Sequence, residues 1–184
     1  MEIKKLKIKD VLEIQLSPIE DNRGFFMRTF DLNFFESSRI NYKWVQENHS
    51  LSKKKNTIRG LHFQLPPHDE TKLVRCIRGS ILDIFVDIRP NSKTFGHWES
   101  VKLSAKNNKL VCIPKGFAHG FLTLEDNCEI LYKVDNCYSK EYERGLIWND
   151  KDLNINWSTN NPILSKKDKI NMTFAEYVKS LEVK

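Results

Sequence analysis

Two short segments place chemically reactive side chains inside apolar, strand-like sequence. His62 lies in the run Ile58–Gln64, and His119 lies in the run Ile113–Phe121. An imidazole has an unperturbed pKa near ~6.5, so it can take up or release a proton at neutral pH, and it is also a common metal ligand. The two histidines are therefore candidates for acid–base catalysis, for metal binding or for contact with a ligand.

Each segment also predicts how its histidine is presented. Alternate side chains of a strand point to opposite faces, so we expect His62 and Gln64 on one face and Arg59 on the other. In the second segment, a Pro-x-Gly turn at residues 114–116 delivers His119 at the start of a new strand.

The Pro-x-Gly-x-x-His element resembles the second sequence motif of the cupin barrels, which usually bind a metal through a His-x-His pair, a Glu and this later His. Here Gln64 stands where the second His of the first motif would be, and His68 and Glu70 lie in a Pro-rich turn. Divalent transition metals need three or four closely held ligands. We therefore expect a cavity with two histidines and no metal, with a metal-dependent cupin as the alternative.

The composition is that of an ordinary globular protein. The 184 residues include 30 Lys or Arg and 24 Asp or Glu, a formal net charge of +6, and 40% of them are hydrophobic. The lysines cluster at residues 4–9 and 166–169 without a helical recognition pattern, so we interpret them as solvated ends and expect no nucleic-acid partner. The excess of positive charge does permit an anionic small molecule.

Membrane insertion and secretion are not expected. The longest nearly apolar stretch, residues 81–88, is interrupted by Asp83 and Asp87 and is far shorter than the roughly 20 residues that cross a bilayer. The basic start of the chain lacks the apolar run of a secretion signal, so we expect a cytoplasmic protein. The cysteines at positions 76, 112, 128 and 137 form no Cys-x-x-Cys pair, and all four are predicted to be small core residues.

The elements that must position the reactive residues are short strands. Strands are predicted near residues 57–64, 73–78, 81–88, 98–103, 109–113, 119–124 and 128–134, with helices only at 31–39 and after an N-cap at Thr173. Gly79-Ser80 predicts a tight hairpin between the runs on either side of it. In the run 81–88, one face is expected to be apolar and the other mixed. Many short strands separated by turns indicate one antiparallel sandwich or barrel.

A specific family resemblance emerges when the motifs are taken together. They occur in the order and spacing of the dTDP-4-dehydrorhamnose 3,5-epimerase family, from about residue 5 to about residue 170. The motifs are Asp21-x-Arg23-Gly24-x-Phe26, Arg59-Gly60-Leu61-His62-x-Gln64, Lys72-Leu73-Val74-Arg75-Cys76, Val86-Asp87-Ile88-Arg89, Ser92-x-Thr94-Phe95-Gly96, Pro114-x-Gly116-Phe117-Ala118-His119-Gly120-Phe121, Tyr132-Lys133 and Trp148-Asn149-Asp150.

The resemblance implies a fold and an activity. The fold is an all-β, cupin-like antiparallel β-barrel or jelly roll with a few short peripheral helices, in a single domain 1–184 with a core of about 5–157 and a C-terminal extension 158–184. The activity is a cofactor-independent and metal-independent epimerisation of a 4-keto-6-deoxy nucleotide sugar through an enolate, with the dTDP-linked sugar as the leading substrate and C3 and C5 as the centres. The resemblance also implies a homodimer in which an N-terminal strand joins the partner's sheet.

The resemblance assigns catalytic roles to four residues. His62 is implied to be the base, Lys72 the cation facing the keto oxygen, Tyr132 the acid on the opposite face, and Asp168 the carboxylate that orients His62. From the residues alone, Asp168 would be a solvated tail residue and Lys72 a surface lysine that opens a strand. Alternation along residues 128–134 points Tyr132 inward, where a core tyrosine with a satisfied hydroxyl is the alternative.

Substrate contacts are implied for a second set of residues. Guanidinium groups suit a pyrophosphate, so Arg23 and Arg59 are candidates for that role, although each could instead pair with an acidic neighbour. Arg28 and Glu70 depart from the Glu and Gln that are common in the family at those positions, which bears on which nucleotide or sugar is held. The implied contacts are Arg23, Phe26, Arg28, Gln46, Asn48, Arg59, His119, Tyr138, Glu143 and Lys167.

Three other functions remain open from the sequence. A related enzyme could invert a single centre or act on another nucleotide sugar, a metal-dependent cupin would lose activity with a chelator, and a non-catalytic binding protein would hold the nucleotide sugar without exchanging its ring hydrogens.

Overall fold

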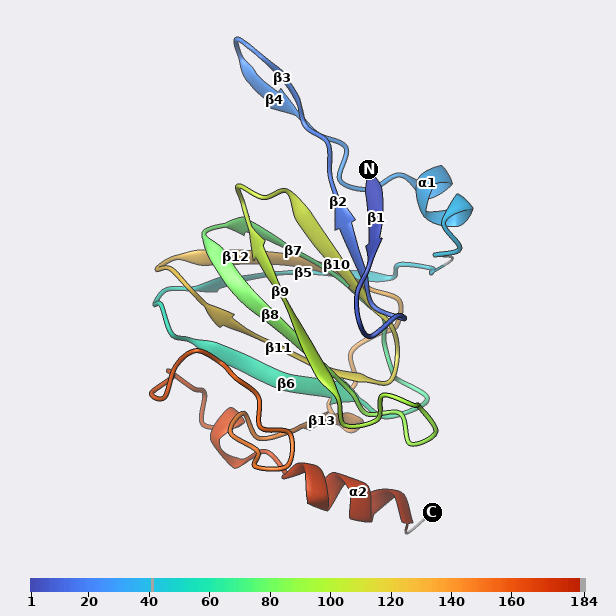
Figure 1. The fold of residues 1–184 in the computed structure, drawn as a ribbon, viewed down its shortest axis with the longest axis vertical. Coiled ribbons are helices and arrows are strands. Elements are labelled where there is room, and N and C mark those ends of the chain that lie inside the picture. Colours follow the sequence, from blue (N-terminus) through green and yellow to red (C-terminus); the bar gives the residue numbers. More distant parts are fainter. Residues whose placement is uncertain (41, 183–184) are drawn as a thin grey trace.

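Two antiparallel sheets face one another in the computed structural model, which describes residues 1–40 and 42–182 (Figure 1). The six-stranded sheet has the order β1-β2-β10-β7-β12-β5, and the five-stranded sheet has the order β13-β6-β11-β8-β9. Two sheets whose inner faces pack on a shared core form the sandwich that the sequence predicts. The all-β, cupin-like jelly-roll prediction is confirmed.

The strands of the first sheet are β1 (Glu2–Lys5), β2 (Leu12–Gln15), β5 (Gln46–Ser52), β7 (Lys72–Arg78), β10 (Lys109–Ile113) and β12 (Cys128–Val134). Those of the second sheet are β6 (Ile58–Gln64), β8 (Ser80–Asp87), β9 (Trp98–Ser104), β11 (Phe117–Thr123) and β13 (Glu143–Gly145). The predicted strands between 57 and 134 are all present, whereas β2, β5 and β13 were not expected from the sequence.

The predicted hairpin at Gly79 is wrong. Strand β7 pairs with β10 and β12, whereas β8 pairs with β11 and β9, so the chain passes from one sheet to the other at this glycine. Gly79 has a φ of 75°, and a Cβ atom there would lie 2.7 Å from the Sγ atom of Cys128. The glycine therefore makes a corner between two sheets. The Gly79-Ser80 sequence fits both such a corner and a tight hairpin turn, so it did not distinguish them.

Both the expected apolar face and the expected mixed face of β8 are buried. Ile81 and Phe85 point into the core between the sheets, while Ile84 and Val86 pack in a second core on the outside of the five-stranded sheet. The C-terminal segment covers that outer face, with contributions that include Trp157 and Tyr177.

Short helices lie at the margins, as predicted. Helix α1 (Leu32–Ser37) is N-capped by Asp31, and η1 (Asp168–Ile170) is a single 3-10 turn. Helix α2 (Phe174–Glu182) begins after Thr173, whose Oγ1 accepts from Glu176 N at 3.2 Å while Glu176 Oε2 accepts from Thr173 N at 2.7 Å. This reciprocal pair is a capping box and confirms the predicted N-cap.

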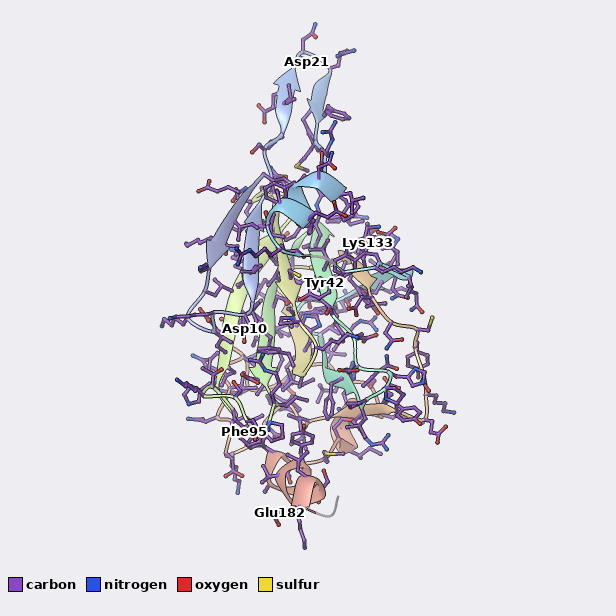
Figure 2. The ribbon with its side chains drawn as sticks, turned by 90° about the vertical axis from the view of Figure 1, so that its right-hand side faces the viewer. Asp10, Asp21, Tyr42, Phe95, Lys133 and Glu182 are labelled. Carbon is purple, nitrogen blue, oxygen red and sulfur yellow. The ribbon has the colours of Figure 1, made fainter. Side chains whose placement is uncertain are left out.

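A hairpin of β3 (Ile19–Asp21) and β4 (Gly24–Phe26) projects from the body of the molecule (Figure 1). Figure 2 places Asp21, in this hairpin, at the opposite end of the molecule from Glu182 in α2. The hairpin side chains pack on little of their own chain, and Phe25 and Phe26 are 66% and 65% exposed.

Three of the four cysteines are core residues. Cys76, Cys112 and Cys128 are buried, but Cys137 is exposed, so the prediction for Cys137 is wrong. The residue follows β12 in a connecting segment, where burial depends on the path of the loop and not on residue type. No helix in the described part of the chain is long and apolar enough to span a membrane.

Candidate active site

One cavity of about 290 Å³ opens between the two sheets and collects most of the predicted site residues. Its walls come from β5, β6, β7, β11, β12 and β13, and from the segment that leads into η1. The lining residues are Ser50, Arg59, His62, Lys72, His119, Phe121, Ile130, Tyr132, Glu143, Ser165, Lys167 and Asp168.

Arg59 and His62 line this cavity together, which corrects the prediction that they point to opposite faces. His119 pairs in register with His62, and Phe121 pairs with Arg59, so three steps along β6 match two steps along β11. The extra residue is a bulge, which resets the alternation of side chains. Gly60 lies in the bulge with a φ of 125°, and a Cβ atom there would lie 2.5 Å from the Cα atom of Gly120.

His62 forms a close pair with a buried carboxylate. Its Nε2 atom lies 2.5 Å from the Oδ1 atom of Asp168, whose side chain is only 4% exposed. Burial raises the pKa of Asp168, but the hydrogen bond and the charge of His62 outweigh burial and hold that pKa below its ordinary value. Asp168 is thus an anion that can orient the imidazole and stabilise its protonated form.

The position of Asp168 is fixed locally by the turn that contains it. Ser165 Oγ accepts a hydrogen bond from Asp168 N at 3.0 Å, and Asp168 is the first residue of the 3-10 turn η1. From sequence alone this residue would be a solvated tail residue. The structure instead places it in the cavity wall, because the C-terminal segment folds back over the five-stranded sheet.

His119 has a carboxylate partner of its own, which the sequence analysis missed. Its Nε2 atom lies 2.8 Å from both carboxylate oxygens of Asp83, and that aspartate has no exposed surface. Asp83 could have been singled out from the sequence, because it is an acidic residue inside the apolar run 81–88. A buried carboxylate needs a partner, and His119 provides one for Asp83.

Lys72 projects into the cavity from the start of β7. Its Nζ atom lies 3.3 Å from Glu70 Oε1, and the two side chains are 11% and 13% exposed. The alternative interpretation of Lys72 as a surface lysine is therefore wrong.

Tyr132 comes from the neighbouring strand β12 and packs partly against the core between the sheets. Burial, followed by the charge of Glu70, raises the pKa of its phenol, so Tyr132 is a neutral hydroxyl at neutral pH.

Polar residues beside the cavity form a second connected group. Glu143 accepts hydrogen bonds from Lys167 Nζ at 2.5 Å and from the Tyr138 hydroxyl at 2.8 Å. Gln46 donates from Nε2 to Asn48 Oδ1 at 2.9 Å, and Asn48 pairs in register with Tyr132. These five residues therefore lie in or next to the cavity.

Three predicted contact residues belong neither to the cavity lining of their own chain nor to the polar group beside it. Arg23 and Phe26 lie on the projecting hairpin, and Arg28 is the second residue after it. Arg23 pairs with Asp21 at 2.5 Å, which is the acidic-neighbour alternative, and Arg28 pairs with Asp31 at 2.9 Å.

Among residues 1–40 and 42–182, no group of three or more His, Cys, Asp or Glu side chains is arranged to hold a metal ion. The two histidines of the cavity are instead each paired with one aspartate.

Known proteins resemble the chain over most of its length. The family model described as dTDP-4-dehydrorhamnose 3,5-epimerase matches residues 5–176. The chain belongs to this family. The enzymes of that name from Shigella flexneri and Escherichia coli K12 are 48% and 45% identical to it, over 91% and 97% of this chain and 93% and 97% of theirs.

Solved structures of the epimerase family share the fold. The enzyme from Bacillus anthracis, crystallised with TDP and PPi bound, superimposes with a TM-score of 0.92 at 40% identity, over 94% of this chain and 99% of that one. The enzyme from Legionella pneumophila, in complex with dTDP-4-keto-L-rhamnose, has a TM-score of 0.90 at 36% identity, with 96% of each chain covered. The family resemblance expected from the motifs is thus confirmed.

Proposed function

We propose that this epimerase inverts C3 and C5 of dTDP-4-dehydro-6-deoxy-D-glucose by removing a proton next to the ketone and returning one to the other face. The observation that carries the proposal is the single cavity that holds an Asp168-paired His62 on one sheet, Tyr132 on the facing sheet and the Lys72 cation. A base, an acid and a positive charge are the groups that such a reaction needs.

His62 is the base in this mechanism. With Nε2 engaged by Asp168, the lone pair on Nδ1 takes the proton from the carbon beside the ketone, and the C–H electron pair becomes the enolate. Asp168 stabilises the imidazolium that forms. The Lys72 ammonium, whose side chain is 11% exposed, stabilises the negative charge that develops on the keto oxygen.

Tyr132 is the acid. Its raised pKa keeps the phenol protonated at neutral pH, so it can give its proton to the enolate carbon from the face opposite His62. The two groups lie on facing sheets, which suits inversion, because a single base returning its own proton would restore the starting centre. Exchange with solvent then removes the proton from His62 and reprotonates Tyr132.

The remaining cations of the cavity suit the pyrophosphate. The Arg59 guanidinium is held by Ser52 Oγ at 2.9 Å and by the Leu51 carbonyl at 3.1 Å. Arg59 and Lys167 offer N–H donors to phosphate oxygens, and His119 is assigned to a contact with the same nucleotide sugar. Gln46, Asn48, Tyr138 and Glu143 are assigned to the rest of the nucleotide sugar.

The projecting hairpin supports a homodimer in which each chain completes the other's site. Ile19 and Phe26 are 71% and 65% exposed, and exposed apolar side chains on a projecting element are typical of an interface. We assign Arg23, Phe26 and Arg28 to the nucleotide in the cavity of the partner. In the same proposal, residues 1–184 form one domain with a core of about 5–157.

Incubation with dTDP-4-keto-6-deoxyglucose in heavy water tests the function. NMR should detect deuterium at both C3 and C5, and His62→Ala should abolish its uptake. Tyr132→Phe should allow some exchange while it impairs inversion, because the base remains and the acid is lost. Absence of uptake with the wild-type protein, while the nucleotide sugar still binds, would support a non-catalytic binding protein, and loss of exchange with a chelator would support a metal-dependent cupin.

A single-centre epimerase is the second candidate. The dTDP-4-dehydrorhamnose 3-epimerase from Streptomyces niveus is 32% identical over 96% of this chain and 85% of its own length. Deuterium at C3 alone would favour this alternative.

A further inference from the structure

Glu70 is the one carboxylate that contacts the Lys72 ammonium among the described residues, and no step of the mechanism above uses it. Its side chain is 13% exposed, and its Oε1 atom lies 3.3 Å from Lys72 Nζ. Burying a carboxylate costs free energy unless it is paired and hydrogen-bonded. We therefore asked what the paired Glu70 does beside the cavity.

The second oxygen of Glu70 is fixed by a buried amide. Gln64, which is 6% exposed, donates from Nε2 to Glu70 Oε2 at 3.0 Å and to the His68 carbonyl at 2.9 Å. Its Oε1 atom accepts from Ser139 N at 2.6 Å. Glu70 is therefore anchored to β6, the strand that carries His62, while it holds a cation on β7.

The charge of Glu70 also affects the pKa of Tyr132, which lies on the strand next to β7. Tyr132 pairs in register with Val74, two residues from Lys72 along β7. After burial, the charge of Glu70 is the largest cause that raises the pKa of Tyr132, the charge of Arg59 lowers it, and that of Glu143 raises it. The other titratable groups that line the cavity are His62, Lys72, His119, Lys167 and Asp168.

We propose that Glu70 is a positioning residue of the active site, which holds the Lys72 ammonium toward the reacting oxygen. This role rests on the proposed function. Glu70 acts through its contact with Lys72 and does not itself touch the substrate. Its charge also disfavours the phenolate form of Tyr132, which provides a second readout.

The test is the pH dependence of kcat and KM for Glu70→Gln. The amide keeps the size of the side chain and can still accept from Gln64, but it loses the charge. We expect kcat to fall roughly 10- to 100-fold through misplacement of Lys72. KM should be nearly unchanged, because no contact with the nucleotide is removed. The alkaline limb of kcat should move to lower pH, since one cause of the raised pKa of Tyr132 is gone.

Two further variants separate charge from general disturbance. Glu70→Asp keeps the charge and shortens the reach, so its alkaline limb should stay near that of the wild type while kcat falls. Asp69→Asn is the matched control, because it removes the same charge from the adjacent residue, which has no ion pair among the described residues. It should leave kcat and the alkaline limb unchanged.

A measurement without substrate tests the role independently of turnover. The phenolate absorbance that Tyr132→Phe removes from the wild-type titration should appear at lower pH in the Glu70→Gln background. A folded Glu70→Gln protein with the wild-type kcat and the same Tyr132 titration overturns the role of Glu70, as does an equal shift in Asp69→Asn. Failure of the proposed function gives a different result, namely no deuterium uptake by the wild-type protein.

Discussion

The imidazole of His62 and the carboxylate of Asp168 lie 2.5 Å apart although they are 106 residues apart in the chain. The pairing requires the C-terminal segment to lie against β6. Just before that strand, Thr57 forms an isolated parallel β-bridge with Ile163. The proposed base, which lies on a strand, is thus paired with a carboxylate from an element outside both sheets.

Asp168→Asn should lower kcat by roughly 10²-fold or more, with a small effect on KM. The amide can keep the imidazole in place, but it cannot stabilise the positive charge that His62 gains. Steady-state kinetics with the dTDP-linked sugar provide the measurement. A variant that retains the wild-type kcat would contradict the assignment of Asp168.

Mixed dimers test whether the hairpin reaches the partner's cavity. Arg23→Ala and His62→Ala should each lower activity strongly when pure, and co-expressed chains should recover about a quarter of the wild-type activity. The reason is that half of the dimers are mixed and each of these has one intact site. His62→Ala mixed with Asp168→Asn is the control, since both residues line the cavity of one chain and no intact site can form. Equal activity of the two mixtures would argue against the shared site.

Asp87 should make the fold sensitive to strong acid. Its side chain has no exposed surface and accepts from Arg89, Ser92 and Thr94. Burial raises its pKa, but these hydrogen bonds outweigh burial and lower it from 3.8 to about 2.

Because the folded-state pKa is the lower one, the carboxylate contributes stability above the unfolded value of 3.8, and this stability is lost as the pH falls toward 2. The contribution is about 2 kcal/mol. Denaturant unfolding of Asp87→Asn at pH 7 should give a lower free energy of unfolding than the wild type, and the difference should shrink as the pH approaches 2. A constant difference would contradict this account.

The cysteines should differ sharply in reactivity. Burial raises the pKa of Cys76 and of Cys112 to about 12, and Cys128 is buried as well, whereas Cys137 is exposed. Because the thiolate is the reactive form, Ellman's reagent should modify Cys137 alone in the native protein and all four thiols after denaturation. Cys137→Ser should remove the fast native reaction. Fast reaction of a second thiol would show that the core opens readily.

The local patterns of the sequence determined the strands between 57 and 134, the cap at Thr173 and the inward direction of Tyr132. These features depend on neighbouring residues, through side-chain alternation and hydrogen bonds across one turn. The motif order also determined the family, because the spacing of many residues is a property of the sequence itself.

Only the tertiary structure decided which strands pair and which charges meet. Gly79 fits a hairpin and a corner between sheets equally well, and the bulge that brings Arg59 beside His62 appears only when β6 is paired with β11. The pairs His62–Asp168 and His119–Asp83 join segments far apart in the chain. Such contacts form when whole strands and segments pack together. The free energy of that packing depends on residues far apart in the chain, so no local sequence pattern determines it.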